Sequence, residues 1–458
     1  MKCTKRSKII LIPHPAQGHV TPMLKLVSAF HNRGFGTIIV TPEYIHYQIV
    51  SRLVESKDQT LSMPIPDGLD KATPQDFFAI EMAMENNMPV HLEAMVPKLD
   101  EDGGIVCMVV DLLASWAIEV ANWCSVPVAG FWPALLATYR LIATIPDLVR
   151  KSLISDAGIP QRLGTICLPD QPILSTEDVP WLVGSLAASK ARFKFWTRTL
   201  DRSKTLRWLL VNSFPDEYID GKQTQLAENS QDHHAPLVFP IGPLSKHAVS
   251  KNIPSFWEED KSCLDWLDKQ KPDSVRHNIV YVSFGRWVSP IGEGKVNNLA
   301  LALEESGRPF IWVLGCAWRE GLPVGYLQRV AMQGKVVSWA PQMEVLQHEV
   351  VGCYLTHCGW NSTMEAIQCQ QRLLCYPVAG DQFINCKYNV EVWGIRVKLN
   401  GFGQKDVAEG LRRVMDQESE KLKHRLRRLY ERTMGEEANS RVLSNLKAFI
   451  DDLMIIKS

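Results

Sequence analysis

The sequence predicts an α/β protein in which two domains are each built on a parallel β-sheet. Two observations carry this prediction: short, wholly apolar runs alternate with helix-like stretches in both halves of the chain, and a Pro-rich stretch of mixed charge separates the halves. Apolar runs without polar alternation are typical of strands covered on both faces, as in a parallel sheet with helical crossovers. The 458 residues suffice for about two or three domains.

The N-terminal half begins with a predicted strand, Ile9–Ile12, followed by a Pro/Gly loop and an amphipathic helix over Pro22–Asn32. Gly34-Phe35-Gly36 interrupts this periodicity before a β-branched strand over Thr37–Thr41. The same theme predicts three more strands: Ile105–Val110, Val126–Phe131 and Trp208–Val211.

The Pro-rich stretch Phe239–Asn278 has little periodicity and is typical of a domain boundary. We therefore expect an N-terminal domain over 1–240, a linker over 241–276 and a C-terminal domain over 277–458 that charged helices close. Its predicted strands are Ile279–Phe284, Phe310–Leu314, Lys335–Ser338, Gly352–Thr356, Leu373–Tyr376 and Ile395–Leu399, with helices at Lys295–Glu305, Ser362–Gln368 and Cys386–Trp393.

Charge and cysteine usage narrow the functional classes. Fifty Lys and Arg balance fifty Asp and Glu, which argues against nucleic acid as the main partner, because phosphate binding needs surplus cations. The eleven cysteines form no C-x-x-C pair and several lie in apolar runs, which favours a reducing compartment and predicts a cytoplasmic protein. The longest apolar stretch, Val126–Tyr139, is interrupted by Pro and Gly, so we expect no transmembrane segment.

Residues that directly follow parallel strands are the first candidates for a site, because ligands collect at the carboxyl ends of such strands. His19 lies in the loop after Ile9–Ile12, and Asp111 directly follows Ile105–Val110. If both strands share one sheet, His19 and Asp111 lie at the same edge, and a carboxylate beside a histidine makes a general base. The alternative is a capping histidine and an aspartate that caps the next helix, and spacing alone leaves both open.

A second candidate follows the strand Gly352–Thr356, where the chain reads His-Cys-Gly-Trp-Asn-Ser-Thr over 357–363. Small and polar residues at a strand-to-helix turn expose backbone N–H groups to an anion such as a pyrophosphate. Glu365 would accept from ribose hydroxyls, and Trp339 would stack on a base. An ordinary capped helix with a packed Trp is the alternative. The sequence contains neither G-x-G-x-x-G nor a P-loop motif. The D-x-D pattern at 100–102 is expected to be a solvated turn, and His233-His234 has no further metal ligands at a suitable spacing. We therefore predict no catalytic metal.

Residues 339–382 carry the elements W-A-P-Q, H-C-G-W-N-S and a terminal D-Q, and this stretch closely resembles the signature box of plant secondary-product UDP-glycosyltransferases, the inverting family 1 enzymes. P-A-Q-G-H-V-T-P, V-V-D and Y-V-S-F-G extend the resemblance over both halves of the chain. The resemblance implies two facing Rossmann-like domains with an interdomain cleft. It implies that His19 is the general base and that Asp111 is its partner. For the nucleoside, it implies that Trp339 and Ala340 contact uracil and that Gln342 and Glu365 bind ribose. It further implies that the diphosphate is held by His357, Gly359, Asn361 and Ser362, and that the sugar is contacted by Trp360, Asp381 and Gln382.

The reaction implied by the resemblance is transfer of glucose from UDP-glucose to a hydroxyl of a small apolar acceptor, a phenolic, flavonoid or terpenoid, with inversion. It needs no cofactor, UDP-glucose being a co-substrate, and we expect a monomer. A catalytically silent binder of nucleotide sugar or of a small hydrophobe is the alternative. Four positions depart from the family pattern. Arg286 replaces a Ser and would add or crowd a phosphate contact, Gln370 and Arg372 replace Gly and Pro, and Tyr376 replaces a Trp. Eight residues are candidates either for acceptor-pocket lining or for core: Phe77, Phe78, Met82, Met84, Met88, Trp181, Phe193 and Trp196.

Overall fold

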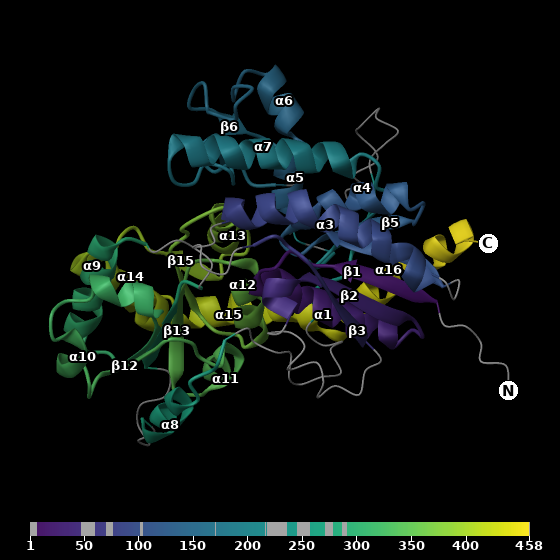
Figure 1. Cartoon of the computed structure of the whole chain (residues 1–458). Coiled ribbons are helices and arrows are strands. Elements are labelled where there is room, and N and C mark those ends of the chain that lie inside the picture. Colours follow the sequence, from purple (N-terminus) through teal and green to yellow (C-terminus); the bar gives the residue numbers. More distant parts are fainter. Residues whose placement is uncertain are drawn as a thin grey trace.

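The computed structural model describes residues 7–46, 60–69, 77–100, 104–169, 171–215, 217, 236–244, 257–270, 278–285 and 291–457. Within these residues the chain forms two parallel sheets covered by helices, together with a short antiparallel pair (Figure 1). Arg286, Glu101, Asp102 and the His233-His234 pair lie outside the described residues.

The first sheet has seven strands in the order β3-β2-β1-β4-β5-β8-β9, all parallel. This order places β1 inside the sheet, between β2 and β4, and Ile9 to Ile12 are fully buried there because helices cover both faces. Its strands are β1 (Lys8–Ile12), β2 (Gly36–Pro42), β3 (Thr60–Ile65), β4 (Ile105–Asp111), β5 (Val128–Trp132), β8 (Trp208–Val211) and β9 (Leu237–Pro240). Its helices are α1 (Gln17–His31), α3 (Phe77–Asp100), α4 (Trp116–Trp123), α5 (Leu136–Ala143), α6 (Ile145–Arg150) and α7 (Leu186–Ser203).

The second sheet has six parallel strands in the order β12-β11-β10-β13-β14-β15. Its strands are β10 (Ile279–Ser283), β11 (Phe310–Val313), β12 (Gly334–Val337), β13 (Val351–Thr356), β14 (Leu373–Cys375) and β15 (Arg396–Lys398). The main helices around it are α8 (Ser262–Lys269), α9 (Glu293–Glu305), α10 (Tyr326–Arg329), α11 (Gln342–Gln347), α12 (Trp360–Gln368), α13 (Gln382–Lys387), α14 (Gln404–Arg412) and α15 (Ser419–Met434).

Two Rossmann-like α/β units on parallel sheets confirm the predicted fold class. Every predicted strand is present, with ends that agree to within two residues. The pattern missed β3, whose sequence TLSMPI mixes polar and apolar residues, and β9, which falls in the predicted boundary stretch. It also missed the long helix α3, which contains Pro89 and Pro97 and buries a stripe of apolar residues. That stripe consists of Ile80, Met84, Met88, Leu92 and Val96.

The last helix, α16 (Glu436–Lys457), leaves the second sheet and packs on the first. Leu446, Phe449 and Leu453 are buried in the core beneath β1 and β8, and Asn445 Nδ2 donates to the Pro240 carbonyl oxygen at 2.7 Å. Figure 1 shows α16 beside the first sheet, with the C-terminus far from α9 and α14. The C-terminal segment therefore ties the two units together, and the division at 240 and 277 stays a prediction.

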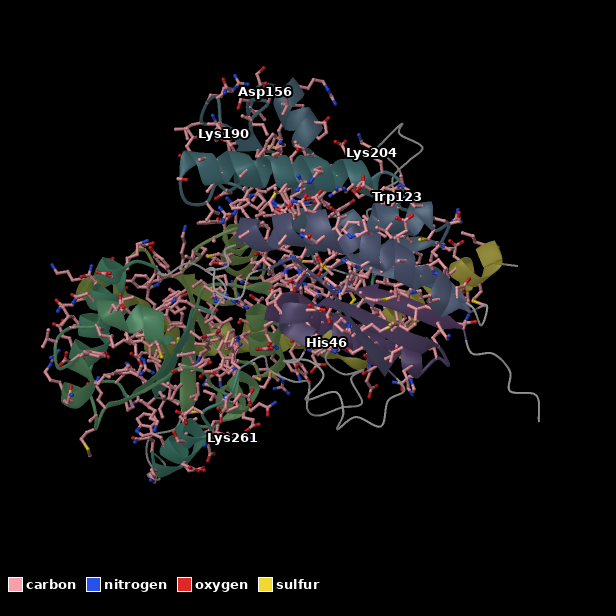
Figure 2. The ribbon with its side chains drawn as sticks, in the orientation of Figure 1. His46, Trp123, Asp156, Lys190, Lys204 and Lys261 are labelled. Atoms are coloured by element: carbon pink, nitrogen blue, oxygen red, sulfur yellow. The ribbon has the colours of Figure 1, made fainter. Side chains whose placement is uncertain are left out.

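A layer made of α5, α6 and α7 and the strands β6 (Thr165–Ile166) and β7 (Leu174–Ser175) lies outside α3 (Figure 1). Figure 2 shows Asp156 and Lys190 on its outer side, pointing away from both sheets. Across the described ranges, none of the helices combines the length and the apolar character that crossing a membrane requires.

Candidate functional site

His19 and Asp111 meet at the carboxyl edge of the first sheet. Strands β1 and β4 are adjacent and parallel, with Ile12 paired to Val110, so the segments that follow them emerge side by side. His19 Nδ1 lies 2.8 Å from Asp111 Oδ2, and the other carboxylate oxygen accepts from the Leu113 backbone N–H at 2.9 Å. Asp111 is fully buried, whereas the His19 side chain keeps 21% of its surface exposed. This geometry fixes the ring and leaves Nε2 as the nitrogen for a substrate.

A second histidine, His14, packs against the ring of His19. His14 is buried and its ring centroid lies 5.2 Å from that of His19, in an edge-on arrangement. Burial and the neighbouring His19 lower the pKa of His14 to about 3, so this ring is neutral at physiological pH. Phe77 also packs against His14, with ring centroids 5.8 Å apart. His14 and Phe77 therefore make the surroundings of His19 on this side aromatic and uncharged.

The turn after β13 holds the second part of the site. His357 is buried against two glycines: a Cβ on Gly359 would lie 2.6 Å from its Nε2, and one on Gly285 would lie 3.1 Å from it. Gly285 also has φ +69°, a conformation that favours glycine. Gly359 directly precedes helix α12, so its turn presents the free N–H groups of that helix beside His357. The two glycines thus let the ring and the helix N-terminus face one anion.

A polar network joins the residues expected to bind ribose. Gln342 Nε2 donates to Glu365 Oε2 at 2.6 Å and to Ser362 Oγ at 3.1 Å. The hydroxyls of Tyr281 and Tyr354 donate to Gln342 Oε1 at 3.2 and 3.1 Å. Both polar atoms of the Gln342 amide therefore have partners within the network, and its N–H₂ group orients Glu365. The Glu365 carboxyl group is the one with acceptor capacity left for ribose hydroxyls. Burial raises the pKa of Glu365, against the opposing effects of Lys25 on α1 and of Gln342.

The pair Asp381 and Gln382 lies at the start of α13. Asp381 Oδ2 accepts from Asn385 Nδ2 at 2.8 Å, and burial raises its pKa, while Asn385 and His19 act in the opposite direction. Gln382 Oε1 accepts from the backbone N–H groups of Val378 and Ala379, both at 2.9 Å. Its carbonyl oxygen is used, so its amide N–H₂ is what remains to contact a sugar.

Three hydrogen bonds hold the two units together around this site. Trp360 Nε1 donates to the Asn212 carbonyl oxygen at 2.8 Å, and Trp393 Nε1 donates to that of Glu217 at 2.9 Å. Asn361 Nδ2 donates to the Gly18 carbonyl oxygen at 2.8 Å, one residue before His19. The electrostatic coupling of Asp381 to His19 shows the same proximity. The structure thus brings the His19 pair next to the turn at 357–362.

These contacts refine the expectations for single residues. The indole N–H of Trp360 is bonded within the junction, so the predicted sugar contact of this residue stays a prediction. Trp339 is half-buried after β12, with its carbonyl oxygen accepting from the Asp260 N–H at 3.0 Å, and Ala340 is buried beside it. Sequence reasoning missed the links through Gly18 and Asn212, because backbone carbonyls carry no signal in a sequence.

Two of the departures from the family pattern have structural counterparts. Gln370 has φ +51°, the left-handed region in which a glycine is comfortable. Arg372 is buried, and its Nη1 donates to Ser419 Oγ at 2.6 Å and to the Met415 carbonyl oxygen at 3.1 Å. Both therefore act on loop and helix packing away from His357.

The candidate lining residues divide between core and surface. Four of them belong to the core of the first unit, which was the alternative to pocket lining: Met84, Met88, Trp181 and Phe193. Met82 is exposed, while Phe77, Phe78 and Trp196 are half-buried. Among these eight, Phe77 is the one packed against His14 and hence near the His19 ring.

A pH prediction follows from His357. Burial lowers the pKa of His357 to about 4, so the ring is neutral at physiological pH and gains charge only as the pH falls toward that value. Its protonation would add a positive charge and strengthen anion binding. We therefore expect affinity for UDP-glucose to stay constant between about pH 6 and about pH 8, where His357 does not titrate. Calorimetry on the His19→Ala variant, which leaves His357 in place and removes the imidazole of the proposed base, measures this; a tightening of about tenfold toward pH 6 would contradict the assignment.

Comparisons with known proteins agree with this geometry. Residues 258–431 match the family model described as UDP-glucoronosyl and UDP-glucosyl transferase. The chain is 54% identical to UDP-glycosyltransferase 82A1 of Arabidopsis thaliana over 96% of both chains, and 32% identical to UDP-glycosyltransferase 83A1 of the same plant over 86% of this chain and 84% of that one. Among solved structures, UGT71G1 of Medicago truncatula complexed with UDP-glucose has a TM-score of 0.81 at 22% identity, covering 98% of each chain. UGT2 of Phytolacca americana, complexed with UDP-2fluoro-glucose and pterostilbene, has a TM-score of 0.80 at 22% identity, covering 98% of this chain and all of that one. At such identities the two structures show a shared fold.

Proposed function

Because the chain belongs to the plant UDP-glycosyltransferase family, we propose that it transfers glucose from UDP-glucose to a hydroxyl group of a small apolar acceptor, with inversion at the sugar. The observation that carries the proposal is the His19–Asp111 pair, with its nitrogen and oxygen 2.8 Å apart and Asp111 fully buried, next to the turn at 357–362. A base in one unit and an anion-binding turn in the other are the two groups that such a transfer needs.

The acceptor oxygen must lose a proton as it attacks C1 of the sugar. His19 is suited to take that proton through Nε2, because Asp111 holds Nδ1 as the donor and stabilises the imidazolium that forms. Full burial of Asp111 strengthens this stabilisation, since few waters screen the carboxylate. His19 is thus proposed as the general base and Asp111 as the residue that orients it.

Negative charge develops on the leaving UDP in the same step. The N-terminus of α12 and the neutral His357 ring point donors toward that charge, a role that a divalent metal fills in other enzymes. Asn361 and Ser362 add side-chain donors, and Glu365 and Trp339 are proposed to hold the ribose and the uracil. Since one displacement inverts the anomeric centre, an α-linked donor yields a β-glycoside.

The first consequence is independence from magnesium and manganese. We expect EDTA to change the rate of transfer by less than about twofold, because backbone N–H groups and His357 already stabilise the diphosphate. The measurement is UDP release with and without the chelator. A large loss in EDTA that magnesium or manganese restores would show that the diphosphate site needs a metal.

The acceptor class is proposed from the surroundings of His19. Phe77 and the neutral His14 supply an aromatic and uncharged side to these surroundings, which suits a phenolic, flavonoid or terpenoid alcohol. The Phytolacca americana UGT2 structure holds pterostilbene, a ligand of that protein that is consistent with this class. The test is an acceptor panel of such alcohols with UDP-glucose, read by mass spectrometry. Absence of any glycoside, together with no slow release of UDP in the absence of acceptor, would favour a silent nucleotide-sugar binder.

The choice of donor sugar is a further prediction. Gln382 has only its amide N–H₂ left to offer, so it pairs with an acceptor oxygen of the sugar, and an epimer with that hydroxyl displaced leaves the amide unpaired. An unpaired buried polar group costs about 1–3 kcal/mol, so we expect UDP-glucose to be preferred over UDP-galactose by roughly 5- to 100-fold. Competing UDP-glucose, UDP-galactose, UDP-xylose and UDP-glucuronate in one reaction measures this. Glucuronide as the main product would overturn the donor assignment and point to Arg286.

A further inference from the structure

Three cysteines from separate segments meet in the interior of the second unit. Cys358 lies in the turn after β13, Cys375 ends β14, and Cys386 lies on α13. All three are buried free thiols, and their sulfur atoms lie within 4.8 Å of one another. Their spacing in the sequence gave no metal-binding signal, because no two of them form a C-x-x-C pair.

The fold itself brings these thiols together. Strands β13 and β14 are adjacent and parallel, and Thr356 is paired with Cys375. Cys358 has φ +69°, an uncommon conformation for a residue with a side chain, and its carbonyl oxygen accepts from Asn385 Nδ2 at 3.0 Å. That bond holds the turn against α13, the helix that supplies Cys386. The arrangement is thus fixed from three sides before any ligand binds.

A buried cation lies beside the three thiols. Arg396 is 4% exposed, and its Nη1 is 3.9 Å from Cys375 Sγ and 3.4 Å from Thr363 Oγ1. Among the residues that the structure describes, no carboxylate forms an ion pair with Arg396. A buried charge is costly unless an opposite charge accompanies it, so a negatively charged group at the sulfur atoms would complement this guanidinium.

The negatively charged group at the sulfur atoms could be three thiolates around a divalent ion or around monovalent copper, and the two differ in net charge. Three thiolates around a divalent ion carry one net negative charge, which Arg396 neutralises. The same thiolates around monovalent copper would leave a buried negative charge uncompensated. Zinc binds thiolate at about 2.3 Å, which sets three sulfur atoms about 4 Å apart. The sulfur atoms of this cluster lie within 4.8 Å of one another, a spacing compatible with such an ion.

We propose that Cys358, Cys375 and Cys386 form a binding site for one thiophilic divalent cation of the zinc and cadmium class, with Arg396 as the charge-balancing residue. Binding replaces the thiol protons with the metal ion and releases them to solvent. Through Cys358 the site holds the turn at 357–359 against β14 and α13. It is therefore a structural site, distinct from any metal at the reacting groups, and independent of the proposed glycosyl transfer.

The test uses cadmium as the probe on the full-length, reduced protein. The exposed thiols Cys167 and Cys316 are first replaced by serine, so that surface binding does not interfere. We expect one tightly bound Cd²⁺ per chain, a thiolate-to-metal charge-transfer band in the ultraviolet, three sulfur ligands by X-ray absorption, and displacement of bound zinc by cadmium, because thiolates prefer the softer ion.

Ligand variants with a matched control identify the site. Cys375→Ser and Cys386→Ser should each weaken cadmium binding by more than about tenfold, since even outer-shell partners of metal ligands are worth about 10- to 100-fold. Cys369→Ser, a half-buried thiol at the end of α12 outside the cluster, should bind as the parent does. Full affinity in both ligand variants would overturn the proposal. If those variants do not fold, the ligand count of the parent protein decides: fewer than three sulfur ligands, or no tight binding, refutes the site.

Discussion

Replacing His19 with alanine is expected to lower kcat by about 10²- to 10⁴-fold, the usual contribution of a general base, while leaving affinity for UDP unchanged. The reason is spatial: His19 stands on α1 of the first unit, whereas the turn and the Gln342–Glu365 network stand in the second. Steady-state kinetics with the best acceptor gives kcat, and calorimetry gives the UDP dissociation constant.

The matched control is His91→Ala, because His91 is an exposed histidine on α3 and its loss should leave both quantities unchanged. A companion variant, Asp111→Asn, tests the tautomer. Its amide nitrogen would face His19 Nδ1 and force the proton onto Nε2, which then cannot accept the acceptor's proton. We expect a large loss of kcat in this variant as well. Collapse of UDP affinity in His19→Ala would instead show that base and nucleotide sites are not separable.

Much of the fold was predictable because its strands are buried on both faces. β1, β4, β10 and β13 are continuous apolar runs, and such runs identify a parallel sheet from composition and spacing alone. The rule that sites collect at strand ends then led to His19 and Asp111 independently of any resemblance. The 2.8 Å contact between them is the consequence of two adjacent strands ending at one edge.

The remaining features depend on how distant segments pack, which periodicity does not encode. The bonds from Trp360 to Asn212 and from Asn361 to Gly18 require the two sheets to be placed relative to each other. The three-thiol cluster likewise depends on a strand pairing and on the position of α13. The return of α16 to the first sheet was missed for the same reason: a charged helical pattern reveals one apolar face but not the partner of that face.

Phe449→Ala is expected to lower the free energy of unfolding by about 3–5 kcal/mol, because it removes a fully buried ring and leaves a cavity. The ring of Phe449 lies 5.7 Å from that of Trp208, 5.9 Å from Phe239 and 6.3 Å from Phe30, so it contacts β8, β9 and α1 at once. Urea unfolding followed by tryptophan fluorescence measures the change, and Trp208 is a reporter within the site of substitution.

Such a loss is large against the net stability of about 5–15 kcal/mol that is usual for folded domains. Leu443→Ala is the control on the same helix, because Leu443 is 38% exposed and a surface truncation should cost about 0.5 kcal/mol or less. Since α16 lies apart from the His19 pair, we expect the folded fraction of Phe449→Ala to retain the parent kcat at low temperature. A fall in kcat without a fall in stability would mean that α16 acts on the site by setting how the two sheets face each other.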